Sequence, residues 1–176
     1  MKRTTGLIAL SLLALCAPAW SAGDHVFVNP SDIKFGPAPP NLPKGALIAV
    51  LYGDPGKPGP VVMRLKAPGG AKIAPHWHTT AENLTVISGE LFLGDGDTMD
   101  MKAAHGLKTG GYHYLPAKAH HYAFTRTATV VQINTEGPFD INYINPADDP
   151  SKAAAPAAKP AAKPAEPAKP AAPAKK

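Results

Sequence analysis

Short apolar runs separated by glycine- and proline-rich turns dominate the middle of this chain. Runs of strand-like length occupy positions 46–52, 61–65, 83–87, 90–93, 112–115, 121–125, 129–134 and 139–144. No stretch of a dozen residues has the apolar spacing of an amphipathic helix. Short strands at close, regular spacing are typical of a β-sandwich, barrel or jelly roll, so the pattern predicts an all-β domain of about eight to ten strands.

The strand-rich region is preceded by a segment with a different composition. Residues 22–45 are rich in proline and contain few continuous apolar runs. Proline fixes the backbone and removes a hydrogen-bond donor, which confines it to edges and turns of sheets. We predict an N-terminal arm here, with one edge strand around Ile33 and Phe35, and a barrel domain over residues 46–149.

The first 21 residues have the pattern of a secretory signal peptide. Two basic residues are followed by an apolar stretch, residues 6–16, which is too short to span a bilayer as a helix. Small residues then fit cleavage after Ser21, and cuts after Ala19 or Ala22 also fit. We expect an exported protein, periplasmic or secreted. An uncleaved membrane anchor remains the alternative.

The single cysteine of the chain, Cys16, lies inside this predicted signal. Cleavage would leave a mature chain without disulfides, thiolate metal ligands or a cysteine nucleophile. Lipidation of Cys16 is a further alternative, although Leu15 stands where that signal requires a small residue.

The C-terminal segment, residues 150–176, is composed almost wholly of alanine, proline and lysine. It contains recurrent prolines and no large apolar side chain that could be buried. We therefore predict a disordered, solvated tail. Its lysines would favour an anionic polymer of the cell envelope, or they would act only as a solubilising end.

The formal charge of +5 belongs to the ends of the chain. The tail has six lysines and one glutamate, whereas residues 23–150 have ten basic and twelve acidic side chains. The predicted barrel is therefore slightly acidic. This charge distribution argues against a nucleic-acid-binding domain.

Four residues form the strongest candidate site: His76, His78, Glu82 and His121. Residues i and i+2 of an extended segment point to the same side, so His76 and His78 project together, about 7 Å apart along the backbone. Glu82 follows a short turn and opens the next strand, where its carboxylate can lie beside the imidazoles. His121 would add a third imidazole from a distant strand.

Three imidazoles and a carboxylate suit one divalent first-row transition metal. The carboxylate favours iron or manganese, while nickel, copper and zinc remain possible. Four protein ligands would leave two positions of an octahedral ion open to water or substrate. The alternative is a pair of surface histidines beside a solvated glutamate.

The surroundings of these residues resemble the first sequence motif of the cupin superfamily. That motif is a glycine, five residues, His-x-His, three or four residues, a glutamate, six residues and a glycine. Gly70, His76, His78, Glu82 and Gly89 match every fixed position at this spacing.

A second stretch is similar to the second cupin motif but matches it only in part. Gly110, Pro116 and His121 are present at the expected spacing. Lys118 replaces a glycine of the motif, and Thr125 replaces an asparagine. The resemblance covers roughly residues 45–145, and its spacing selects His121 over His120 as the inward-facing histidine.

This resemblance implies a compact antiparallel β-barrel, or jelly roll, with a metal ion inside and frequent homodimerisation. It also implies functions that range from dioxygenase and isomerase to non-catalytic binding. We expect a metal-dependent enzyme that acts on a small organic molecule, with Glu82 as a ligand or a general base. A metal-binding or sensing module of the cell envelope is the alternative.

Overall fold

The structure is a computed structural model that describes residues 25–153. The predicted signal peptide and nearly all of the predicted tail lie outside the described residues. The elements, in chain order, are η1 (Pro30–Asp32), β1 (Gly36–Pro37), β2 (Leu47–Tyr52), β3 (Gly59–Ala67), β4 (Lys72–Trp77), β5 (Glu82–Ser88), β6 (Glu90–Asp95), β7 (His105–Lys108), β8 (Tyr112–Leu115), β9 (His121–Thr125), β10 (Thr129–Gly137), β11 (Asn142–Tyr143), η2 (Pro146–Asp148) and α1 (Pro150–Ala153).

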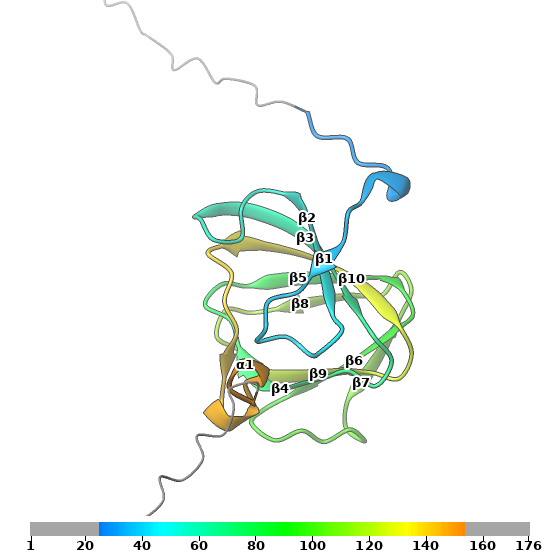
Figure 1. Cartoon of the computed structure of the whole chain (residues 1–176). Helices are drawn as coiled ribbons and strands as arrows, with labels where there is room; N and C mark the ends of the chain where they lie inside the picture. Colours follow the sequence, from blue (N-terminus) through cyan, green and yellow to red (C-terminus); the bar gives the residue numbers. More distant parts are fainter. Residues whose placement is uncertain (1–24, 154–176) are drawn as a thin grey trace, which may run out of the picture.

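Two antiparallel sheets face each other across one apolar interior (Figure 1). One sheet has six strands in the order β1-β2-β3-β10-β5-β8, and the other has five in the order β11-β4-β9-β6-β7. Consecutive strands alternate between the sheets from β3 to β6 and again from β7 to β11, whereas β1 to β3 share one sheet and β6 and β7 share the other. The predicted all-β jelly-roll barrel is thus confirmed.

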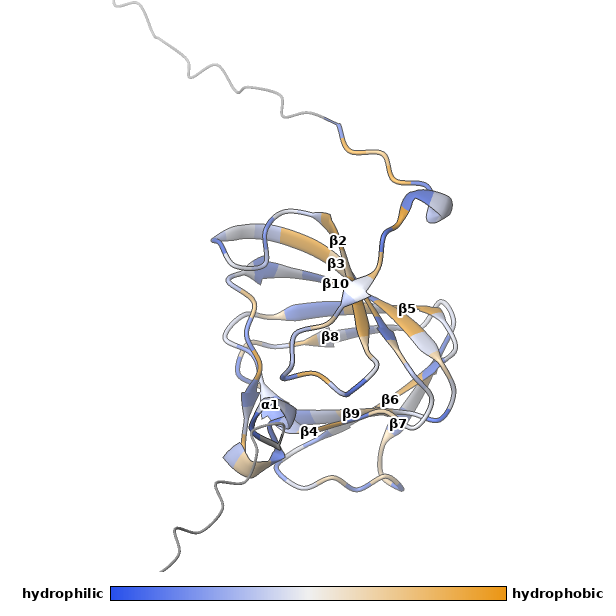
Figure 2. Cartoon of the chain, in the orientation of Figure 1, coloured by the Kyte–Doolittle hydropathy of each residue, from blue (hydrophilic) through white to orange (hydrophobic). Residues whose placement is uncertain are grey.

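Alternating side chains build the interior between the sheets. In β10, every second residue from Thr129 onward is buried, and β5 has the same alternation from Glu82. Hydrophobic colour follows β2, β3 and β5 in Figure 2. The buried cluster consists of Leu42, Ala46, Val61, Met63, Leu65, Leu84, Val86, Leu91, Leu93, Ala123, Val131 and Ile133. Each large side chain contributes about 1.5–3 kcal/mol when fully buried.

A second, smaller cluster covers the outer face of the five-stranded sheet. Phe92, Tyr122 and Phe124 are buried there, and Met99 and Ala104 pack against them. The Tyr122 hydroxyl also donates a hydrogen bond to the Asp100 carbonyl, at 2.6 Å. Both faces of the sheet are consequently covered along β9, and all five of its residues are buried.

The arm predicted at residues 22–45 contacts the barrel in several places. Gly36 and Pro37 pair with β2, and Leu42 joins the interior cluster. The edge strand expected around Ile33 and Phe35 lies slightly later, at β1. No helix among the described residues is long and apolar enough to cross a membrane.

Most predicted strands match the structure, and two are additional. β8 and β9 have the predicted bounds, while β11 is only two residues long because the chain from Phe139 to Ile141 forms a loop. β4 was expected only as an extended segment, and β7 was not predicted. His105 is the first residue of β7. β7 lacks the apolar alternation by which strands are recognised, because it is a largely exposed edge strand.

Candidate metal centre

Strand pairing brings the four candidate residues together inside the barrel. His76 lies near the end of β4 and pairs with His121, the first residue of β9. His78 follows β4 directly, and Glu82 is the first residue of β5 in the opposite sheet. All four side chains are buried, with relative exposures of 2–4%.

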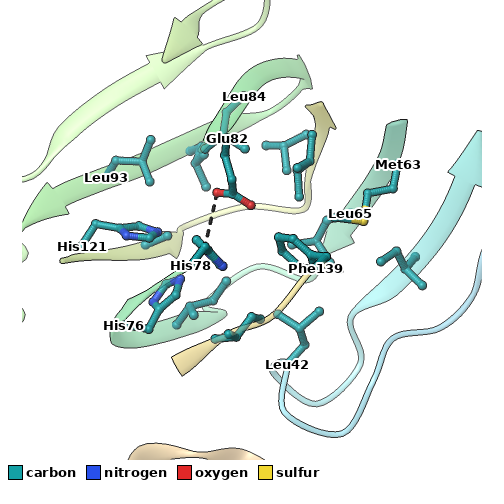
Figure 3. Close-up of a pocket in the computed structure, with 17 residues that line it drawn as sticks. Leu42, Met63, Leu65, His76, His78, Glu82, Leu84, Leu93, His121 and Phe139 are labelled. Atoms are coloured by element: carbon teal, nitrogen blue, oxygen red, sulfur yellow. Dashed lines mark ion pairs between the residues drawn. The ribbon is translucent and has the colours of Figure 1, made fainter. Parts of the chain in front are cut away.

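The three imidazoles converge on one point. Their nearest ligand atoms lie within 4.8 Å of one another, which is close enough for all three to hold a single metal ion. Glu82 is not part of this set, but its Oε2 lies 3.4 Å from Nε2 of His78. In Figure 3 the carboxylate of Glu82 approaches the imidazoles from the opposite wall of the cavity.

Backbone carbonyls determine which ring nitrogen of each histidine faces the centre. Nδ1 of His76 donates to the carbonyl of Ala74 at 2.7 Å, and Nδ1 of His121 donates to that of Ala119 at 3.1 Å. Nδ1 of His78 donates to the carbonyl of Asp140. Since a carbonyl can only accept, each Nδ1 carries the proton and each neutral ring directs its Nε2 lone pair inward. This is the arrangement that ligates a metal.

The contact between His78 and Glu82 requires a cation or a proton. A neutral His78 with a protonated Nδ1 presents a lone pair to a carboxylate oxygen 3.4 Å away, which is repulsive if the carboxylate is also ionised. A proton between Nε2 and Oε2 would remove this conflict. A metal ion bound by both atoms would do the same.

Burial opposes charge on these groups. Together with smaller effects of the neighbouring His121 and His78, it lowers the pKa of His76 to about 2. It also lowers the pKa of His121 to about 4, against a smaller opposing effect of the Ala119 carbonyl. Burial raises the pKa of Glu82, and His78 partly offsets that rise. His76 and His121 therefore remain neutral at physiological pH, as metal ligands must.

These shifts predict that the metal-free protein loses stability as the pH falls below about 6.5. Between that value and about 4.5, the unfolded chain protonates His76 and His121 while the folded chain does not. Each histidine then costs about 1.4 kcal/mol of unfolding free energy per pH unit. Glu82 acts oppositely, because its raised pKa favours the folded state at lower pH, but it offsets at most one histidine.

Urea unfolding in the presence of a chelator, at pH 7.5, 6 and 5, checks this expectation. Paired aspartates do not interfere, because the pKa values of Asp54, Asp140 and Asp149 are lowered from 3.8 and lie below this window. An unfolding free energy that is constant across the three pH values would contradict the burial of neutral histidines.

A cavity of about 60 Å³ adjoins the four residues. Its wall is otherwise apolar. The lining side chains are Leu42, Ile48, Met63, Leu65, Ile73, His76, His78, Glu82, Leu84, Leu91, Leu93, His121, Ala123, Val131, Ile133, Phe139 and Ile141. The site is therefore open to a small molecule on one side, unlike a closed structural metal site.

Several solved structures share this architecture. The polyketide cyclase RemF from Streptomyces resistomycificus is 16% identical, with a TM-score of 0.61 over 73% of this chain and 92% of that one. A cupin described as RmlC-like, from Shewanella frigidimarina, is 14% identical, with a TM-score of 0.50 over 65% and 91%. This chain has the cupin fold. An acetylacetone dioxygenase from Acinetobacter johnsonii is 15% identical, with a TM-score of 0.56 over 77% and 87%. No family model and no curated protein matches the sequence.

The partial match to the second cupin motif has a structural counterpart. Lys118, where the motif has glycine, adopts a left-handed backbone with φ of 61°. Its backbone N–H donates to the carbonyl of His78 at 2.8 Å. Thr125, where the motif has asparagine, is buried and donates to the carbonyl of Pro68 at 2.6 Å. Both residues therefore donate a hydrogen bond to a backbone carbonyl, although their types differ from those of the motif.

The structure separates the two adjacent histidines of the second motif as the spacing predicted. His121 faces the cavity, whereas His120 is exposed and contacts Asp97 on the surface. Tyr122 points to the outer cluster, as its alternation with His121 requires. His113 is half-buried on β8 and outside the lining of the cavity.

Sequence reasoning did not identify the loop that supports His78. The backbone carbonyl of Asp140 accepts a hydrogen bond from Nδ1–H of His78. Its carboxylate accepts from the Thr79 N–H at 2.8 Å, the Thr79 hydroxyl at 2.6 Å and the Asn142 amide at 2.9 Å. Burial alone would raise the pKa of Asp140, but these hydrogen bonds outweigh it and lower that pKa. The ring of Phe139 stacks on His78, with centroids 5.1 Å apart.

Proposed function

We propose that the chain is a metal-dependent cupin enzyme that acts on a small organic molecule. The observation that carries this proposal is the convergence of three imidazole ligand nitrogens within 4.8 Å of one another, beside a carboxylate and an apolar cavity. The number and type of donor atoms fit one divalent first-row ion, with iron or manganese favoured by the carboxylate.

His76, His78 and His121 would hold the ion, and Glu82 would be a fourth ligand. A bound ion would supply Lewis-acid or oxygen-activating chemistry at the cavity wall. The carbonyls of Ala74, Ala119 and Asp140 hold the imidazoles in position. Glu82 is the only carboxylate on the cavity wall among the described residues, so it is also the group that would accept a proton from a bound molecule.

Oxygenation and isomerisation are the reaction classes that this site supports best. Two neighbours in fold are described as a dioxygenase and a cyclase, and both reactions take place on small organic substrates. No alternative nucleophile, such as serine, cysteine or lysine, lines the cavity among the described residues. The chemistry must therefore come from the ion and from Glu82.

Elemental analysis followed by turnover measurements tests the proposal. The full chain, purified without chelators, is expected to contain about one first-row metal ion per chain, and oxygen uptake or product formation should require it. Small ketones, diketones and hydroxyketones form the first substrate panel. A chain without stoichiometric metal would overturn the proposal. A chain that binds metal but converts none of these molecules would instead favour the binding or sensing module.

We also propose, from the sequence, that the protein is exported and that the basic tail contacts an anionic polymer of the envelope. The support is the signal-like segment 1–21 and the lysine-rich segment 150–176. Cell fractionation with an antibody to the folded domain tests export. A protein found only in the cytoplasm, with its first 21 residues intact, would exclude it.

A further inference from the structure

We infer that the site takes a one-ended substrate: a small molecule with a single oxygen-containing polar end and a hydrocarbon body. This inference names the substrate class of the site described above, and it rests on the proposed function. It follows from the chemistry of the cavity wall, from its size and from its connection to the surface.

The polar groups of the wall are confined to one end. Of the 17 lining side chains, the only polar ones are His76, His78, Glu82 and His121. The other side chains are aliphatic or aromatic, and no lysine, arginine, serine, threonine or amide lines the cavity among residues 25–153. A hydroxyl or a charge on the far end of a bound molecule would therefore lose its water without gaining a partner, which is costly.

Figure 3 shows the polar side chains grouped together, with Leu93 beside His121 and Leu84 beside Glu82. His121, His78 and Glu82 lie together, and Phe139, Met63 and Leu42 lie beyond them, away from His121. Met63 is fully buried and Leu42 is 7% exposed, so the apolar end is shielded from water. A molecule with its oxygen at the histidines would place its hydrocarbon part against these side chains.

The volume limits the hydrocarbon part. The cavity has about 60 Å³ of space, whereas an apolar cavity of about 150 Å³ is known to accommodate benzene. A body of a few carbon atoms fits without movement of the wall. Sugars, amino acids and other molecules with several separated polar groups do not fit this combination of size and chemistry.

An outer pocket of about 260 Å³ lies next to the cavity, and the side chains between the two spaces line both. These shared side chains are Leu42, Ile48, Met63, Phe139 and Ile141. A small molecule would therefore enter between the N-terminal arm and the loop that follows β10. The Tyr143 hydroxyl holds the arm through a hydrogen bond to the Asn41 carbonyl at 2.7 Å. Leu42 stands at this boundary and should limit the length of the substrate.

Methyl NMR of the full chain, labelled at its methionine methyl groups, tests the inference with a matched pair of probes. The probes are 2-butanone and 4-hydroxy-2-butanone, which differ only by a hydroxyl at the far end. We expect 2-butanone to shift the Met63 signal in a saturable way and to bind at least about tenfold more tightly than its hydroxylated partner. Met99 and Met101 lie outside the cavity lining and are internal controls.

The titration is run on the metal-free and the zinc-loaded protein. Failure to bind zinc would refute the proposed metal site, while the metal-free titration would still decide the selectivity of the cavity. Equal or tighter binding of 4-hydroxy-2-butanone in both forms would overturn the inference, as would the absence of any Met63 shift with 2-butanone.

The boundary residue is tested with a larger probe, cyclohexanone. The wild-type cavity should exclude it, and Leu42→Ala should admit it, because the substitution joins the cavity to the outer pocket. Leu51→Ala is the control, since Leu51 lines a different pocket on the outer face of the sheet. Should Leu42→Ala fail to fold, the pair of butanones still decides the inference. Binding of cyclohexanone to the wild type at the Met63 signal would contradict the size limit.

Discussion

Replacement of His121 by alanine is expected to abolish stoichiometric metal binding, while replacement of the adjacent His120 should leave it intact. His121 is 3% exposed and directs Nε2 to the centre, whereas His120 lies on the surface beside Asp97. The loss of one of three converging imidazoles leaves two imidazoles from the same segment, His76 and His78, together with Glu82, and this reduced set holds an ion far less tightly.

Two measurements compare the wild type with the variants. They are the metal content after dialysis and the melting temperature with and without added metal. The wild type and His120→Ala should contain about one ion per chain and melt at a higher temperature with metal, because an ion that binds only the folded state stabilises it. His76→Ala and His121→Ala should lose both effects. Metal retained at wild-type stoichiometry in both variants would show that the three histidines are not the site.

Replacement of Glu82 by glutamine should have opposite effects on the metal-free and metal-bound protein. The glutamine N–H can donate to Nε2 of His78, which lies 3.4 Å from Glu82 Oε2, and this removes the need for a shared proton. The metal-free variant should therefore melt a few degrees higher than the wild type at pH 7.5. Its metal affinity should fall about tenfold or more, because an anionic ligand is lost.

The same variant should change the number of protons released when metal binds. Calorimetric titrations in buffers of different ionisation enthalpy count these protons, and the variant should release fewer than the wild type at pH 7.5. Glu82→Asp, which keeps the charge but shortens the side chain, is the comparison. Identical affinity and proton release in wild type and Glu82→Gln would mean that the carboxylate does not take part in the site.

The strand pattern was sufficient to predict an all-β domain, and the resemblance to the cupin motifs added the jelly-roll barrel. β8 and β9 were located to the residue, and the bounds of β8 follow from Pro116 and from the turn glycine Gly110, whose φ is 84°. Gly89 likewise needs its positive φ of 81°, and a Cβ there would lie 2.6 Å from the Ala128 carbonyl. β7 escaped prediction because an exposed edge strand has no apolar alternation to mark it.

The sequence predicted the residues of the candidate site. It did not predict the residues that orient them or close the cavity. The spacing of His76 and His78 on one strand and the motif around Glu82 identified the residues that the structure brings together. Asp140 acts on His78 through a contact that spans 62 positions, and its own sequence neighbourhood contains no motif. Leu42 was assigned to the arm because prolines surround it, whereas its side chain closes the cavity.

The imidazoles of this centre are oriented by main-chain carbonyls, and this has a consequence for how such a protein can diverge. The carbonyls of Ala74, Ala119 and Asp140 remain in place whatever side chains these positions carry, so long as the strands and the loop keep their path. Drift at these positions would leave the tautomers of His76, His78 and His121 unchanged. The apolar wall of the cavity is made of side chains, so a single substitution there changes which molecules the cavity can hold. Descendants of this chain should therefore change their substrates sooner than their metal site.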